Sequence, residues 1–199
     1  MRKGEQTREA ILERALTLAS RVGLAGLTIG SLAEELGISK SGLFAHFDSK
    51  EALVVQLLER AGQHYVEAVV RPALSAPAGE PRVRALFERT LRWPELVPQP
   101  GGCIFVAAAI ELDDQPGPAR DLLVRLRQGW FDLVAGAVER AIRAGHFRAS
   151  VDPGQFAFDM DGIVLAWHHA SRLLGDPHAD ERAQRAFEAL LASARAPRQ

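Results

Sequence analysis

The sequence predicts an all-α protein built in two parts. Apolar side chains recur at the three- and four-residue intervals of helices through most of the 199 residues. The β-branched runs and Asn-Gly turns that predict hairpins are missing from the sequence. Pro- and Gly-containing stretches separate the helical segments, and the stretch at residues 75–81 divides an N-terminal part from a larger C-terminal part.

The first quarter of the chain predicts three helices in close succession. An amphipathic helix is expected over about residues 5–22, where a pair of glycines ends its pattern. Thr28 is expected to cap a short helix that ends at Gly37, and Ser39 to cap another over residues 40–45. Two short helices joined by a tight glycine turn form the unit that places one helix in the DNA major groove. This segment therefore predicts DNA binding.

The rest of the chain is expected to be helical between loops. Asp48 and Glu51 have capping-box spacing at the start of a helix that stops at Pro72. Further helices are expected over about residues 81–93, 103–112, 118–144, 153–174 and 180–194, and the tail at residues 195–199 is expected to fray.

Composition places the protein among ordinary globular chains. It is 47% hydrophobic and 25% charged, with a net charge of −1. Phosphate contacts must therefore come from local placement, for which the candidates are Arg2, Lys3, Arg8, Lys40 and Lys50. No apolar run is long enough to span a membrane, no signal-peptide pattern is visible, and Cys103 is the single cysteine. We expect a cytoplasmic protein with no membrane partner.

An ordered string closes the first quarter: His46, Phe47, Ser49, Lys50, Glu51 and Leu53. It extends a gapless match that also includes Thr7, Arg8, Ile11, Leu12, Ala15, Leu18, Gly23, Thr28, Leu32, Ala33, Gly37, Ile38, Ser39 and Leu43. With these residues the segment resembles the DNA-binding domain of the tetracycline-repressor (TetR) family. The family usually has Tyr where this chain has Phe44, so a hydroxyl contact to a phosphate would be missing.

Short side chains at the start of the second short helix would let its backbone enter the groove. Lys40 is expected to donate to guanine and Ser41 to approach several bases. The resemblance implies that Phe44 and His46 lie at the DNA surface and that Lys50 contacts a phosphate. The expected DNA-binding residues are Thr28, Ser39, Lys40, Ser41, Gly42, Phe44, His46 and Lys50.

Plainer interpretations exist for each of these residues. Any one lysine can be a solvated charge, Phe44 can be core, and Thr28 can be a helix cap and nothing more. Phe44 can also pack on a thymine methyl group. Leu43 and Phe47 fall on the opposite face of the helix and are expected in the core.

The resemblance implies that residues 1–50 form a DNA-binding domain and residues 51–199 an effector-binding and dimerisation domain, connected by a helix over about 49–71. Pairing two recognition helices across a two-fold axis favours near-palindromic operators in double-stranded DNA. The expected homodimer interface contains Phe156, Ile163, Val164, Leu174, Phe187, Leu190 and Leu191. Composition leaves open the alternative that these side chains pack inside one monomer.

The resemblance also implies a pocket for a small-molecule effector among the middle helices. Apolar side chains with a few polar groups suit such a pocket and suit an ordinary helical core equally well. The candidates are Trp93, Phe105, Trp130, Phe131, Phe158, Asp161, Trp167 and His168.

Parts of the sequence also fit two other classes of protein, an enzyme and a protein-interaction module. His168 and His169 near Asp159 and Asp161 would suit acid–base or metal chemistry, but no catalytic motif accompanies them. The run at residues 111–114 offers carboxylates, yet it is better interpreted as a helix end before a turn. We expect no enzyme, cofactor or metal.

A helical protein-interaction module would explain the amphipathic helices but not the ordered string at residues 28–53. The sequence thus predicts a dimeric transcriptional regulator of the TetR type, and we expect a repressor that a small molecule releases. Activation instead of repression stays open, because it depends on where the operator lies.

Overall fold

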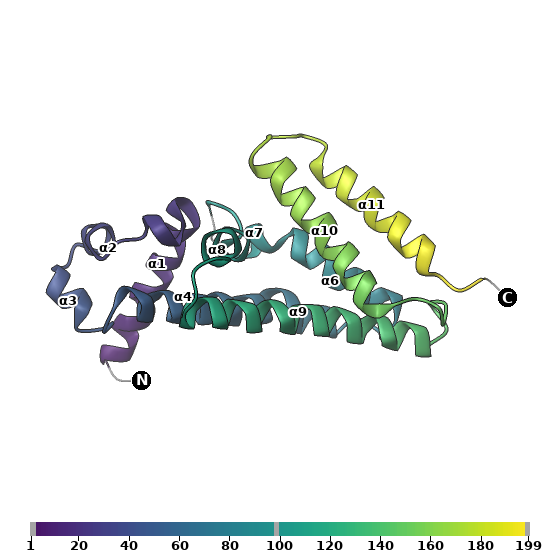
Figure 1. The fold of residues 1–199 in the computed structure, drawn as a ribbon, viewed down its shortest axis with the longest axis horizontal. Helices are drawn as coiled ribbons and strands as arrows, with labels where there is room; N and C mark the ends of the chain where they lie inside the picture. The colour runs from purple at the N-terminus through teal and green to yellow at the C-terminus, as the bar shows by residue number, and fades with distance from the viewer. Residues whose placement is uncertain (1–2, 98–99, 198–199) are drawn as a thin grey trace. The chain divides into compact units, whose positions relative to one another are not determined.

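The structure, a computed structural model, describes residues 3–97 and 100–197, and in this part of the chain it is built from helices (Figure 1). It divides into two compact units, one of Met1–Tyr65 with Pro94–Leu126 and one of Val66–Trp93 with Arg127–Gln199. The first unit contains α1 (Lys3–Gly26), α2 (Ile29–Leu36), α3 (Lys40–Phe44), α4 (Lys50–Tyr65), α8 (Ile104–Leu112) and the start of α9 (Pro118–Arg143). The second contains η1 (Val66–Val70), α5 (Arg71–Leu74), α6 (Glu80–Leu91), the rest of α9, α10 (Pro153–Arg172) and α11 (Ala179–Ala194), while α7 (Trp93–Leu96) starts where this grouping changes.

The predicted helix-turn-helix is confirmed down to its capping residues. α2 follows Thr28, whose hydroxyl oxygen accepts from the backbone N–H of Ser31 at 2.9 Å. It ends at Gly37 in the left-handed conformation, with φ of 64°. Ser39 then caps α3 by accepting from the N–H of Gly42 at 3.0 Å. These local bonds satisfy N–H groups that would otherwise lack partners at the start of each short helix.

The inner side of α3 is anchored by two apolar residues. Leu43 and Phe47 are buried, which confirms their expected place in the core. The cap of α4 differs from the expectation, because the hydroxyl oxygen of Ser49 accepts from the N–H three residues further on, at 3.0 Å. The predicted capping box between Asp48 and Glu51 is therefore wrong, since the cap lies at Ser49 and Ala52 has no side-chain acceptor to complete a box.

The helix expected to stop at Pro72 instead ends at Tyr65, and a further short helix, α5, includes Pro72. α4 passes into the π-helical turn η1, and Pro72 takes the second position of α5, where a missing N–H costs no helical bond. Arg89 of α6 braces the irregular turn by donating from Nε and Nη2 to the carbonyl oxygen of Ala68, at 2.9 and 2.6 Å. The turn spans only five residues, which is too short a window for helical periodicity to reveal it.

Stacked aromatic rings form much of the core of the second unit. Phe87 of α6 and Phe187 of α11 are fully buried, with ring centroids 3.9 Å apart and planes 12° apart. Phe147 and Phe156, also buried in this unit, form a second stacked pair with ring centroids 5.7 Å apart. α10 and α11 run antiparallel, side by side (Figure 1). This pairing fixes which side of α10 faces inward.

The end of α11 is held by backbone bonds. Arg195 forms an isolated antiparallel bridge with Phe147, and the N–H of Ala196 donates to the carbonyl oxygen of His146 at 2.9 Å. The expectation of a frayed tail is therefore wrong for Arg195 and Ala196. None of the described helices combines the length and apolarity that crossing a membrane requires.

Candidate functional site

The outward side of α3 carries most of the residues expected to contact DNA. Ser39, Lys40 and Ser41 are exposed, and Phe44 is 49% exposed although it is a large apolar side chain. His46 lies close by and is partly exposed. Since Leu43 and Phe47 hold the inner side, the fold brings these side chains to one surface and leaves the start of α3 open to a partner.

Hydrogen bonds to hydroxyl groups order the starts of α2 and α3 at this surface. Ser39 and Ser41 hold their hydroxyl oxygens 3.1 Å apart. The N–H of Thr28 donates to the hydroxyl of Ser31 at 3.1 Å, which completes a capping box. In this DNA-free structure Thr28 therefore acts as a helix cap. For its backbone N–H to donate to a phosphate, the bond from that N–H to Ser31 would have to break.

The basic candidates are engaged in different ways. Lys50 donates from Nζ to the carbonyl oxygen of Ala25 at 3.2 Å, while the side chain of Lys40 lies over Gly30 at the start of α2. The guanidinium of Arg8 lies 5.7 Å from the centroid of the Phe47 ring. Arg2 and the side chain of Lys3 lie outside the described residues. Lys40 thus lies beside the cap of α2, on the surface that carries the start of α3.

The residues expected to line an effector pocket lie in different environments. Phe105 belongs to the first unit and packs edge-on to Tyr65, with centroids 6.0 Å apart. Trp93 and Trp130 are buried in the second unit, and Phe131 lies under the guanidinium of Arg127 at 5.6 Å.

Phe158 is 66% exposed, so its side chain lies on the surface of the second unit.

The polar candidates have partners within the second unit. Asp161 is buried and accepts from Nη2 of Arg127 with both oxygens at 2.7 Å, so its charge is compensated. The indole N–H of Trp167 donates to Asp180 at 2.6 Å. Burial lowers the pKa of His168, and the nearby charges of Arg172 and His169 lower it further. A half-buried imidazole of this kind is held neutral at physiological pH.

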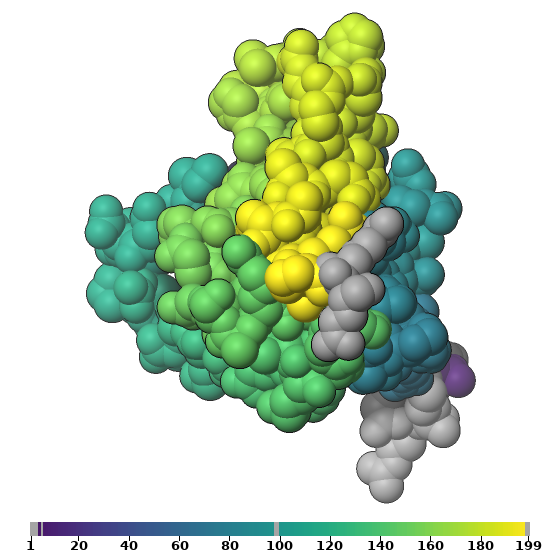
Figure 2. Space-filling view, turned by 90° about the vertical axis from the view of Figure 1, so that its right-hand side faces the viewer, coloured from purple at the N-terminus to yellow at the C-terminus, as the bar shows by residue number. Residues whose placement is uncertain are grey.

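A hollow of about 490 Å³ opens on the second unit, and none of the eight effector candidates lines it. Its walls are Glu80, Pro81, Arg84, His146, Arg195 and Ala196. Figure 2 shows the face of the molecule on which α11 lies, in yellow.

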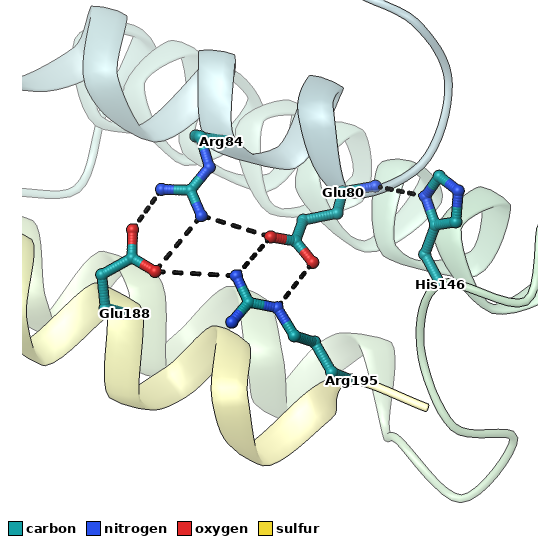
Figure 3. Close-up of polar contacts among 5 residues, drawn as sticks. All are labelled: Glu80, Arg84, His146, Glu188 and Arg195. Atoms are coloured by element: carbon teal, nitrogen blue, oxygen red, sulfur yellow. Dashed lines mark hydrogen bonds and ion pairs between the residues drawn. The ribbon is translucent and has the colours of Figure 1, made fainter. Parts of the chain in front are cut away.

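Three of the lining residues, Glu80, Arg84 and Arg195, form a network of alternating charges with Glu188 (Figure 3). Arg195 donates to Glu80 at 2.9 and 2.5 Å, and Arg84 bridges Glu80 and Glu188. The N–H of Glu80 donates to Nδ1 of His146 at 3.1 Å. Each guanidinium already has carboxylate partners, so the cluster is better understood as a clamp between α6 and the end of α11 than as an anion site.

The clamp predicts a loss of stability in acid. The bond from Arg195 lowers the pKa of Glu80, and the bond from Arg84 lowers the pKa of Glu188. A carboxyl group whose pKa is lowered in the folded state stabilises the protein at pH values above its pKa in the unfolded state. This stabilisation is lost as the pH falls through the pKa of the folded state. We expect the contribution to be at most about 1 kcal/mol, because solvent screens the half-exposed Glu188.

Urea unfolding between pH 7 and pH 3 checks this expectation. Glu80→Gln with Glu188→Gln should be less stable than wild type at pH 7 and should approach it at pH 3. Asp114→Asn, an exposed carboxylate in the first unit, is the matched control. Parallel pH curves for wild type and the double variant would show that the clamp does not contribute.

The expected dimer residues divide into core and surface. Phe156, Phe187 and Leu191 are buried within one protomer, as the alternative interpretation allowed, so they are not available on its surface. Ile163, Val164 and Leu190 are partly exposed, and Leu174 is 66% exposed.

The exposed apolar residues of α10 were not all anticipated. Phe158, Leu165 and Leu173 are spaced by seven and eight residues and lie on one outward side. Apolar residues surround this helix on most sides in the sequence, so periodicity alone does not distinguish its outward side from its inward side.

Carboxylates at residues 111–114 do not form a metal centre in the part of the chain that the structure describes, where no three candidate ligands gather suitably. Glu111 instead accepts from two backbone N–H groups at the end of α1. No local sequence pattern indicates this contact, because Glu111 lies 87 residues after Leu24 and 86 residues after Ala25.

Comparison with known proteins adds family matches over both parts of the chain. Residues 11–57 match the family model of bacterial regulatory proteins, tetR family, and residues 79–187 match that of the tetracyclin repressor-like C-terminal domain. The tetracycline repressor protein class C of Escherichia coli is 46% identical over 52 residues, which are 26% of this chain and 24% of that protein. The chain thus spans about a quarter of that curated relative.

Solved structures match over nearly the full length. A TetR transcriptional regulator from Chloroflexus aurantiacus has a TM-score of 0.85 and 26% identity, with 96% of each chain covered. AibR, solved in complex with isovaleryl coenzyme A and operator DNA, has a TM-score of 0.75 and 21% identity, with 94% of this chain and 98% of that chain covered. The latter likeness concerns the fold alone.

Proposed function

Because the chain belongs to the tetracycline-repressor family of bacterial regulatory proteins, we propose that it is a sequence-specific DNA-binding transcriptional regulator, a repressor released from its operator by a small molecule. The observation that carries the proposal is the exposed, capped start of α3 on a buried Leu43–Phe47 anchor. A short helix supported in this way can enter a major groove without losing its fold.

Contacts with DNA are assigned by side-chain chemistry. Lys40 and Ser41 read base edges, while Ser39 and Gly42 let the backbone approach. Thr28, His46 and Lys50 contact phosphates. Phe44 lacks the hydroxyl of a tyrosine, so its exposed ring packs against a thymine methyl group.

Lys40→Ala and Lys50→Ala are expected to differ in kind. Loss of a base contact at Lys40 should change sequence preference and cost about 1–3 kcal/mol on the best site. Loss of a phosphate contact at Lys50 should weaken binding to all sequences alike and reduce the salt slope by about 1.

Titration of selected and scrambled DNA at several salt concentrations separates the two expectations. A uniform loss for Lys40→Ala would make Lys40 a backbone contact. An unchanged salt slope for Lys50→Ala would leave its bond to Ala25 as its role.

A homodimer is proposed through the outward side of α10. Phe158, Leu165 and Leu173 expose apolar side chains on one side of α10 and just after it, and Ala186 and Ala189 of the neighbouring helix α11 are exposed and small. A two-fold axis through this surface would bury the same residues on both protomers. Such a dimer presents two copies of α3, which matches a near-palindromic operator.

The effector is proposed to bind among the helices of the C-terminal part, residues 51–199. Buried Trp130 and half-buried Phe131 and His168, all in the second unit, are the candidates for contact with it, and their mostly apolar character favours a largely hydrophobic compound. The complex of AibR with an acyl coenzyme A and operator DNA supports this pairing of ligand and DNA on the same fold. A cytoplasmic location follows from the proposed role.

Selection of binding sites from random double-stranded DNA tests the proposal. We expect the purified protein to enrich a near-palindrome, which then serves as the probe for screening effectors by release. A folded protein that enriches no sequence at low salt would overturn the regulator and favour a helical protein-interaction module.

A further inference from the structure

The end of α1 is a turn held in place from outside the DNA-reading helices. Gly23 interrupts the helix with φ of 76° and ψ of 173°, and one more helical turn follows before Leu27. A new helical turn begins with N–H groups that have no partner in the preceding residues. Those of Leu24 and Ala25 therefore require an acceptor from elsewhere.

Glu111, near the end of α8, supplies that acceptor. Its Oε1 accepts from the N–H of Leu24 at 3.1 Å, and its Oε2 accepts from the N–H of Ala25 at 2.5 Å. Both carboxylate oxygens are thus used, and the negative charge lies where the helical turn presents its positive end.

Gly23 is fitted to this carboxylate in two respects. Its positive φ is disfavoured for residues with a side chain, and a Cβ atom at this position would overlap Glu111 Oε1. α8 also packs along α1, and in the segment before α8 the N–H of Gly101 donates to the hydroxyl of Ser20 in α1 at 3.3 Å. Glu111 therefore adds to other contacts that hold this part of the chain against α1.

The turn that Glu111 caps leads directly into α2. Leu27 is fully buried and Thr28 is the cap of α2, so little chain separates the capped N–H groups from the DNA surface. Lys50 holds the same turn from the other side through the carbonyl oxygen of Ala25. Displacement of α8 along α1 must either break the carboxylate cap or move this turn.

We propose that Glu111 is a positioning residue that couples α8 to the DNA-reading helices α2 and α3 by capping the turn at residues 24–26. The proposal rests on the function proposed above, because it assigns to Glu111 control over the placement of α3. Without both carboxylate oxygens the turn at residues 24–26 loses its acceptors. The arrangement of α2 and α3 that binds DNA then becomes one of several conformations.

Glu111→Gln is the decisive variant, since it keeps size and shape but presents an NH₂ group to one of the two N–H donors. We expect hydrogen exchange at the amides of Leu24 and Ala25 to accelerate about 10- to 100-fold, the range for loss of a charge-assisted bond. Affinity for the selected operator should fall up to about tenfold while the salt slope stays unchanged, because no phosphate contact is removed.

Asp114→Asn is the matched control. Asp114 lies three residues after Glu111 and is exposed, so this variant also removes one carboxylate charge. It should behave as wild type in both measurements, and thermal unfolding should show that both variants are folded. Glu111→Asp should restore the charge without the reach, and so should resemble Glu111→Gln.

Unchanged exchange at Leu24 and Ala25 in Glu111→Gln would overturn the cap. Accelerated exchange with unchanged operator affinity would overturn the positioning role. A wild-type protein that selects no DNA would overturn the proposed function and the positioning role with it, while the exchange measurement would still decide whether Glu111 caps the turn.

Discussion

Phe187→Ala is expected to lower the free energy of unfolding by about 3–5 kcal/mol. The ring is fully buried in the second unit and stacks on Phe87 at 3.9 Å, so its removal loses both apolar burial and a ring pair. Well-packed helices on both sides do not collapse into the space left behind, and the cavity adds to the loss. Urea unfolding at a fixed protein concentration measures the difference.

Phe158→Ala provides the control for this prediction, because it removes the same ring from a position that is 66% exposed. In the monomer its effect on stability should stay within about 0.5 kcal/mol. Repeating both measurements at several protein concentrations separates folding from association. If Phe187→Ala dissociated a dimer and left the monomer's stability intact, Phe187 would be an interface residue, as first expected from the sequence.

Leu165→Glu is expected to convert the proposed dimer to monomers and to reduce operator affinity at least about 100-fold. A two-fold interface contains every residue twice, so one substitution buries two unpaired charges. The desolvation of an unpaired charge costs several kcal/mol, which corresponds to a hundredfold or more in association. A monomer would retain only one copy of α3 for DNA.

Sedimentation equilibrium and operator titration check this second prediction together. Val124→Glu is the control, since Val124 is 50% exposed on α9 and Leu165 is 44% exposed on α10. A Leu165→Glu protein that stays dimeric would exclude the outward side of α10 as the interface. A monomeric variant with full operator affinity would show that dimerisation is not needed for DNA binding.

Local chemistry explains why the helix-turn-helix was predictable from the sequence. Thr28, Gly37 and Ser39 act on bonds within three or four residues, so their roles depend little on distant parts of the chain. The burial of Leu43 and Phe47 follows from their spacing of four residues, which places two apolar side chains on the same side of the chain. Such features are visible in the residue order itself.

The cap of α4 and the passage through Pro72 show where local patterns fail. Asp48 and Ser49 are both good capping residues, and only the direction in which the chain enters the helix selects Ser49. Pro72 is tolerated because η1 precedes it and Arg89 compensates the turn from another helix. Neither condition can be inferred from the residues nearby.

The sequence by itself determined that the chain is helical, where most helices begin and end, and which short helix is suited to DNA. Only the tertiary structure decided which sides of α10 and α11 are buried, and which distant residue caps the turn before α2. Capping and helical periodicity act over a few residues, so they can be read along the chain. Burial and the pairing of Glu111 with Leu24 and Ala25 depend on helices that meet only when the whole chain is folded.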